Sequence, residues 1–254
     1  MKLNIGIVQT SISENISENV AIICEYISQS SDTNILLFPE GMISGYYPKN
    51  PDYVRNLNKD VLDAVIKEIG NAVKKRHVNA IIPTALFEDG KWFNTSLWFD
   101  TSGAIKHIYK KCNLSNLDRN HFMAGDKLET YMINGVKTAI QMCREITYPE
   151  QWLYLKLQGA CVIFHLNNNQ GGDSNWENVY KTRAYENQYF IVSVNLSHPN
   201  QKLFSYSITP KGEIMLKTTN AQKIYYATLD LDSVKNDFIN QRRKTVVNLV
   251  YTKK

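Results

Sequence analysis

The spacing of apolar residues in the first third of the chain predicts alternating strands and helices. Residues 4–8, 34–38 and 79–83 are short apolar runs with the length of strands. Between them, residues 17–27 carry apolar side chains at positions i, i+3, i+4 and i+7, and residues 62–73 carry a similar stripe. This spacing is typical of helices that bury one face. The pattern therefore predicts a βαβαβ opening.

The pattern then changes to strands joined by short turns. Turn residues at Glu88-Asp89-Gly90 and Thr101-Ser102-Gly103 separate apolar strands, and such short connections predict antiparallel pairing. Further strands and helices alternate to the end of the chain. Strands are expected at residues 85–87, 92–99, 104–109, 130–133, 136–142, 161–166, 189–196, 205–209, 213–216 and 224–229, and helices near residues 149–157, 176–187 and after residue 230.

Strands of both pairing types indicate a mixed α/β fold. Strands that are apolar along their whole length need cover on both faces. We therefore expect two mixed sheets packed face to face, with helices outside. The chain has 254 residues, 43% of them hydrophobic, which is enough for one large core, and no stretch resembles an interdomain linker.

Composition excludes several classes of partner. The net charge of +5 is mild and the basic residues are scattered, so a nucleic-acid surface is not expected. The first residues alternate like a strand rather than a signal peptide, and no segment reaches membrane-spanning length. Four cysteines without CxxC spacing indicate free thiols in a reducing cytoplasm. Five histidines in no ligand-spaced cluster make a metal site unexpected.

Cys143 lies where the predicted strand 136–142 gives way to a helix that begins near Pro149. At such a junction the strand holds the side chain facing open space, and the next backbone N–H groups are unpaired. A thiol placed there is able to act as a nucleophile. The alternative is a small buried hydrophobic residue, which is the usual role of a free cysteine.

Charged residues follow two other predicted strands. Glu40 comes directly after strand 34–38, and Lys110 and Lys111 follow strand 104–109. A buried carboxylate can serve as general base for a thiol, and a nearby ammonium favours the thiolate and binds an oxyanion. Taken singly, each of these residues is more often an ordinary surface or ion-pair residue.

Three motifs in order resemble the catalytic signatures of the nitrilase superfamily of carbon-nitrogen hydrolases. They are LFPEG at residues 37–41, YKKCNL at residues 109–114 and MCREITYPEQW at residues 142–152. Weaker similarities are IGIVQT at residues 5–10, SGYYP at residues 44–48 and RAYEN at residues 183–187. The resemblance covers about residues 3–230 of a single predicted domain, residues 1–254, and leaves a C-terminal helix and arm over about residues 231–254.

This resemblance implies a four-layer α-β-β-α sandwich and a catalytic triad of Glu40, Lys111 and Cys143. Lys111 matches the family's lysine because it stands three places before Leu114. Asp118 occupies the position of a second family carboxylate, which is usually a glutamate. The shorter side chain leaves open whether Asp118 orients Lys111 or positions the leaving group.

The expected reaction is hydrolysis of a small linear amide or carbamoyl compound. Cys143 would attack the carboxamide carbon while Glu40 transfers protons, and the backbone N–H of Arg144 would join Lys111 in binding the oxyanion. No metal or organic cofactor is required. Family members that act on nitriles tend to carry Trp-Glu after the cysteine, so the pair Arg144-Glu145 favours an amide substrate.

Several polar residues are candidates for the substrate pocket. These are Tyr46, Tyr47, Asn167 and Asn168. The Asn/Gly-rich loop at residues 167–172 would hydrogen-bond a polar substrate, or it is simply a turn.

Other functions and assemblies stay open from the sequence. Asn113, where the family usually has a histidine, and Asp118 depart from the family pattern and leave open a catalytically silent oligomerisation or binding module. The same triad also serves an acyltransferase or an ammonia-donating glutaminase. The resemblance implies a homodimer or higher homo-oligomer, and the apolar residues 245–251 would form an arm on a neighbouring subunit or a frayed tail.

Overall fold

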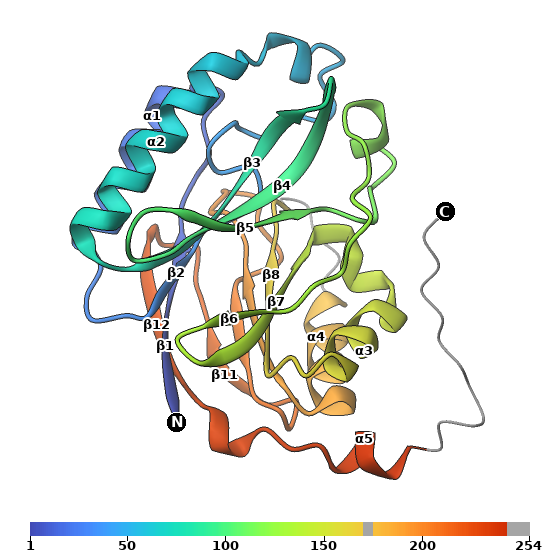
Figure 1. Ribbon diagram of the computed structural model, residues 1–254. Coiled ribbons are helices and arrows are strands. Elements are labelled where there is room, and N and C mark those ends of the chain that lie inside the picture. Colours follow the sequence, from blue (N-terminus) through green and yellow to red (C-terminus); the bar gives the residue numbers. More distant parts are fainter. Residues whose placement is uncertain (170–174, 243–254) are drawn as a thin grey trace.

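Two mixed β-sheets lie at the centre of the molecule (Figure 1). The computed structural model describes residues 1–169 and 175–242, and within these ranges each sheet has six strands, in the orders β12-β1-β2-β3-β4-β5 and β11-β10-β9-β8-β7-β6. The strands are β1 (Lys2–Gln9), β2 (Ile35–Leu37), β3 (Asn79–Glu88), β4 (Lys91–Phe99), β5 (Ile105–Lys110), β6 (Tyr131–Ile133), β7 (Val136–Met142), β8 (Val162–Leu166), β9 (Phe190–Val194), β10 (Tyr206–Ile208), β11 (Ile214–Lys217) and β12 (Lys223–Asp230).

Helices cover the outer face of each sheet (Figure 1). The first sheet carries α1 (Ile16–Gln29) and α2 (Lys59–Arg76), and the second carries α3 (Pro149–Leu157) and α4 (Trp176–Asn187). Short helical turns lie in the loops, namely η1 (Val54–Asn56), η2 (Asp118–Asn120), η3 (Cys143–Thr147) and η4 (Leu231–Ser233), and the short α5 (Asp237–Gln241) follows η4. The predicted α-β-β-α sandwich is confirmed.

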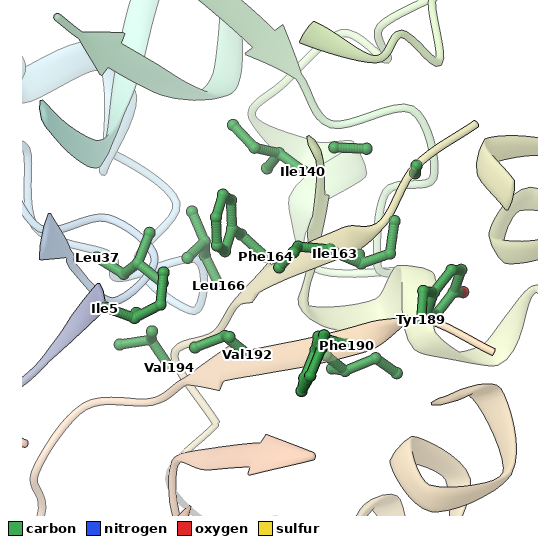
Figure 2. Packing of buried hydrophobic residues seen from close by; sticks show 14 of the residues in the cluster. Ile5, Leu37, Ile140, Ile163, Phe164, Leu166, Tyr189, Phe190, Val192 and Val194 are labelled. Carbon is green, nitrogen blue, oxygen red and sulfur yellow. The ribbon is translucent and has the colours of Figure 1, made fainter. Parts of the chain in front are cut away.

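Side chains alternate across the strands and fill two separate layers. In β2 and the residue after it, Leu37 faces the layer between the sheets, whereas Leu36 and Phe38 pack in the layer with α1 and α2. Figure 2 shows Ile5 and Leu37 of the first sheet on the side of β8 that carries Phe164. A strand with apolar residues on both faces is buried in both layers, which explains its continuous apolar run.

The carboxyl ends of the central parallel strands bring loops of the two sheets together. The strands β1, β2 and β3 are parallel in one sheet, as are β7, β8 and β9 in the other. The backbone N–H of Glu40, after β2, donates to the carbonyl of Asn167, after β8, at 3.1 Å. Residues that follow these strands therefore meet across the two sheets.

β3 is one unbroken strand, whereas the sequence predicted two strands that separate after Pro83. The pairing of β2 with β3 ends at Ile81, so no strand lies beside Pro83 on that side. The carbonyl of Pro83 faces this side and accepts from the backbone N–H of Ile43 at 3.1 Å. The missing proline N–H therefore interrupts no ladder, and the prediction of a break was wrong.

Two further sequence predictions concern the C-terminal residues 245–251 and membrane-spanning segments. The arm expected at residues 245–251 lies outside the described residues. Within residues 1–169 and 175–242, no helix is long and apolar enough to cross a membrane.

Candidate active site

Glu40 lies in the turn that follows β2, with its side chain fully buried. Its Oε1 accepts from Lys111 Nζ and from Asn94 Nδ2, both at 2.8 Å. Its Oε2 accepts from the backbone N–H of Asn168 at 3.2 Å. These donors come from β4, from the end of β5 and from the loop after β8, so both sheets fix the position of this carboxylate.

The ammonium group of Lys111 lies between two carboxylates. Its Nζ is 2.8 Å from Glu40 Oε1 and 2.8 Å from Asp118 Oδ2, and all three side chains are completely inaccessible to solvent. Burial lowers the pKa of Lys111, but the neighbouring carboxylates outweigh burial and the net pKa is raised. Burial raises the pKa of Asp118, but the ammonium outweighs it and the net pKa is lowered. Lys111 is therefore a cation and Asp118 an anion near neutral pH.

Glu40 is the member of this cluster best suited to exchange a proton. Burial raises the pKa of Glu40 above its usual 4.5, the Lys111 ammonium opposes this rise, and the negative charge of Asp118 adds to it. With both carboxylates ionised, the cluster holds one more negative than positive charge, so a proton on Glu40 neutralises it. A carboxylate of this kind accepts a proton from a neighbouring acid and returns it.

Cys143 begins η3 with a backbone conformation that few non-glycine residues adopt, because its φ angle is +44°. Elsewhere in the described chain, non-glycine residues with positive φ end helices or lie in hairpin turns. These are His77, Asp89, Asn134 and Gln188. Cys143 does neither. Such a conformation costs about 1–3 kcal/mol and is found mainly at functional sites.

The thiol of Cys143 is protonated in its surroundings. Burial raises the pKa of Cys143, the charge of Glu40 raises it further, and Lys111 opposes both effects. A protonated thiol is a weak nucleophile, so attack by Cys143 requires a base that removes its proton. Glu40 is the neighbouring group whose raised pKa matches this role.

A cavity of about 830 Å³ is lined by Cys143. Of the predicted pocket residues, Tyr46, Tyr47 and Asn168 lie in its wall. Asn167 does not, because its side chain is fully buried and donates to Ser193 Oγ at 3.0 Å. In addition to these residues, the wall contains Glu14, Pro48, Lys49, Asn50, Leu114, Ser115, Asn116, Leu117, Arg119, Arg144, Tyr148, Asn169 and Trp176.

Tyr46 connects the cavity to the buried charges. Its hydroxyl donates to Asp118 Oδ1 at 2.7 Å, while the backbone N–H of Ser115 donates to Asp118 Oδ2 at 3.0 Å. The structure thus brings the predicted residues Glu40, Lys111 and Asp118 into one buried cluster. In the part of the chain that is described, no group of three or more His, Cys, Asp or Glu side chains is arranged to hold a metal ion.

The sequence did not single out two polar side chains that hold the site together. Asn94, on β4, donates to Glu40, and His165, on β8, contacts the carbonyl of Cys143 at 3.0 Å. The available signal was a polar residue inside an apolar strand, as in VIFHL at Val162–Leu166. Such a residue is buried, but its partner depends on which strands are neighbours, and the sequence did not reveal the strand order.

Glu145 ties the segment that carries Lys111 to the turn that carries Cys143. Its fully buried carboxylate accepts from the backbone N–H groups of Cys112 (2.8 Å), Asn113 (3.0 Å) and Met142 (2.8 Å). The hydroxyl of Tyr109 lies 2.8 Å from both carboxylate oxygens. Burial raises the pKa of Glu145 to about 6, so this acceptor is ionised at neutral pH.

Replacing Glu145 by alanine is expected to lower the free energy of unfolding by about 3 kcal/mol, because several buried and part-buried donors lose their acceptor at once. Urea denaturation followed by circular dichroism measures this change. The matched control is Glu150→Ala, an exposed carboxylate in the first turn of α3, which should change stability by less than about 0.5 kcal/mol. Equal losses in the two variants would contradict the role given to Glu145.

Comparison with curated proteins finds similar chains among hydrolases. A probable nitrilase of Schizosaccharomyces pombe is 27% identical over 250 residues, with 92% of this chain and 91% of the relative covered. An (R)-stereoselective amidase of Pseudomonas sp is 27% identical over 84% of this chain and 81% of its own length. The human omega-amidase NIT2 is 21% identical over 89% of this chain and 88% of its own length.

Solved structures share the fold over nearly the whole chain. An amidase from Nesterenkonia sp. aligns with a TM-score of 0.85 and 18% sequence identity, covering 97% of this chain and 94% of that chain. A carbon-nitrogen hydrolase from Helicobacter pylori G27 aligns with a TM-score of 0.85 and 17% identity, covering 96% of both chains.

The family model for carbon-nitrogen hydrolases matches residues 4–237. The match includes all three motifs that resemble the nitrilase superfamily. The chain therefore belongs to the carbon-nitrogen hydrolase family, the nitrilase superfamily that the three motifs resemble.

Proposed function

We propose that the protein hydrolyses a small linear amide or carbamoyl compound through a thioester on Cys143. One observation carries this proposal: Cys143 lies, in a strained turn, on the wall of a cavity beside a buried Glu40 whose pKa is raised. Lys111 holds Glu40 in place. Amidase relatives support an amide as substrate.

In the first half of the reaction, Glu40 takes the thiol proton while Cys143 Sγ forms a bond to the carboxamide carbon. The carbonyl oxygen becomes an oxyanion, which the Lys111 ammonium and the backbone N–H of Arg144 stabilise. The C–N bond then breaks, and Glu40 gives its proton to the departing nitrogen. The products of this half are ammonia or an amine and a thioester.

In the second half, water replaces the departed amine. Glu40 removes a proton from water as the oxygen attacks the thioester carbon, and the same donors bind the second oxyanion. The C–S bond breaks, Cys143 regains a proton from Glu40, and a carboxylic acid leaves. Asp118 stays ionised throughout and keeps Lys111 in position.

The charges on the cavity wall favour a substrate that carries a negative group. Among the described wall residues, Lys49, Arg119 and Arg144 are cationic and Glu14 is the acidic one. Arg144 directly follows Cys143 and lines the same cavity, so its guanidinium is the proposed partner of that negative group. A monoamide of a dicarboxylic acid has the required amide and carboxylate, and the omega-amidase relatives support this class.

The setting proposed for this reaction is the cytoplasm, with the protein in a homodimer or higher homo-oligomer. Free cysteines at positions 24, 112, 143 and 161 fit a reducing compartment.

Turnover and an acyl adduct should both depend on Cys143. Incubation with a panel of dicarboxylic monoamides, N-carbamoyl compounds, neutral amides and nitriles should release ammonia and give an acyl mass on Cys143. Cys143→Ala should abolish both, and Glu40→Gln should slow turnover by about 10³-fold, because proton transfer contributes 10²- to 10⁴-fold. Cys161→Ala is the matched control, since this half-buried thiol lies outside the described cavity wall. If folded wild-type protein releases no ammonia and forms no acyl adduct, the result would favour a catalytically silent module.

The acid limb of the profile of kcat/KM against pH should move to lower pH when the charge of Asp118 is removed. The base must be ionised, so kcat/KM for a neutral amide should fall as pH drops through the pKa of Glu40, which lies above 4.5. Asp118 raises that pKa, so Asp118→Asn should shift the acid limb to lower pH while kcat decreases. The exposed Asp52→Asn should leave the profile unchanged. A limb that stays or moves upward in Asp118→Asn would argue against Glu40 as the base.

The side chain of Arg144 should select for an anionic substrate. Arg144→Gln keeps the backbone N–H, so kcat should stay near the wild-type value. KM for succinic acid monoamide should rise about fivefold, as for loss of a partly exposed ion pair, while KM for a neutral amide of similar length stays constant. Arg55→Gln is the control, because Arg55 is exposed and pairs with Asp52. An equal change for both substrates would rule out charge recognition by Arg144.

A further inference from the structure

His165 lies directly beneath the turn that carries Cys143. It belongs to β8, its side chain is fully buried, and its ring packs against Trp152, Trp176 and Tyr180 with centroid distances of 5.4, 6.1 and 5.3 Å. Both ring nitrogens have partners. Nε2 is 3.0 Å from the carbonyl oxygen of Cys143, and Nδ1 is 2.9 Å from the hydroxyl of Tyr180.

The partners of His165 determine where the protons lie. A carbonyl oxygen only accepts, so Nε2 carries the proton that is donated to Cys143. Burial lowers the pKa of His165 to about 3, so the ring is neutral and Nδ1 has no proton. The hydroxyl of Tyr180 must therefore donate to Nδ1, and its oxygen accepts from Ser193 Oγ at 2.9 Å and Asn167 Nδ2 at 3.3 Å. The hydrogen bonds form one directed chain from Ser193 to the carbonyl of Cys143.

This chain controls the direction of the next backbone N–H. The peptide between Cys143 and Arg144 is planar and trans, so its C=O and N–H groups point in opposite directions. His165 holds the C=O toward the buried side, and the N–H of Arg144 is therefore directed away from His165. Cys143 and Arg144 both line the cavity, so this N–H is placed to meet an oxyanion there.

We propose that His165, oriented by Tyr180, is a positioning residue that locks the Cys143–Arg144 peptide and so presents the Arg144 N–H to the oxyanion. This inference rests on the proposed thioester reaction. Cys143 pays a conformational cost at its positive φ, and the hydrogen bond to its carbonyl opposes rotation of the peptide into a less strained state. A merely structural His165 would stabilise the turn without a particular effect on oxyanion formation.

Two reactions of the same thiol separate these roles. Acylation by an amide passes through an oxyanion. Alkylation by iodoacetamide does not, because Sγ displaces iodide at a saturated carbon while the thiol proton goes to Glu40. Loss of the oxyanion donor should therefore slow acylation alone, whereas a displaced thiol or base should slow both reactions.

The experiment compares wild-type protein with His165→Leu, His165→Gln and Tyr180→Phe. In His165→Leu, single-turnover acylation of Cys143 should fall about 10²-fold with KM little changed, while alkylation stays within about threefold. Glutamine places an amide N–H near the position of Nε2, so His165→Gln should recover most of the acylation rate. Tyr180→Phe removes one oxygen atom and should give an intermediate loss of the acylation rate. This variant keeps the proposal testable if His165→Leu does not fold.

His107→Leu is the matched control. His107 is a half-buried histidine on β5 whose ring stacks on Tyr131 at 4.5 Å, and its loss should leave both reactions of Cys143 unchanged. Parallel loss of acylation and alkylation in His165→Leu and Tyr180→Phe, or no loss of either, would overturn the positioning role.

The protonation state of His165 can be tested whatever the activity. The ¹⁵N chemical shifts of the imidazole in wild-type protein should identify Nε2–H as the main tautomer, with conversion toward a mixture in Tyr180→Phe. An Nδ1–H tautomer in the wild type would overturn the inference. If wild-type protein is alkylated but is not acylated by any amide, that result would contradict the proposed function. The tautomer of His165 would still show whether the directed chain of hydrogen bonds exists.

Discussion

The buried ammonium of Lys111 is the interaction on which the site depends. Removing such a charge from water costs several kcal/mol, and this cost is offset only when the partners are close and fully hydrogen-bonded. Glu40 and Asp118 meet that condition, each at 2.8 Å. The two carboxylates come from different segments of the chain, so both segments must be held at fixed distances from the end of β5. The surrounding fold is therefore under a strict geometric constraint.

The packing of the two sheets supplies that constraint. Glu40 and Lys111 follow strands of the first sheet, whereas Cys143 and Asn168 follow strands of the second. The hydrogen bonds from Asn168 to the carboxylate and backbone of Glu40 cross between the sheets. Because protein interiors are close-packed, a shift of one sheet against the other would separate Cys143 from Glu40. The large core between the sheets thus fixes the geometry of the site as well as the stability of the fold.

Local sequence patterns were sufficient to predict most helices and strands and the charged residues that follow strands. They did not predict the partners of buried polar groups. Apolar runs such as residues 34–38 and 161–166 predicted strands correctly, and motif order placed Glu40, Lys111 and Cys143 at strand ends. Pro83 led to the wrong prediction of a break in β3. A proline is tolerated within that strand because no neighbouring strand pairs with it on one side. His165 and Glu145 were also missed as supports, since their partners are set by strand order and by loop positions far along the sequence.

The strain at Cys143 explains why the turn needs support from two directions. A residue at φ +44° relaxes unless its flanking peptides are held. On the preceding side, Glu145 accepts from the backbone N–H of Met142; on the following side, His165 donates to the carbonyl of Cys143. These hydrogen bonds hold the backbone on both sides of Cys143, at the peptide that precedes Met142 and at the peptide that follows Cys143. In the proposed reaction, the thiol and the oxyanion donor are then in position without a reorganisation cost, which is the condition under which fixed dipoles contribute most to catalysis.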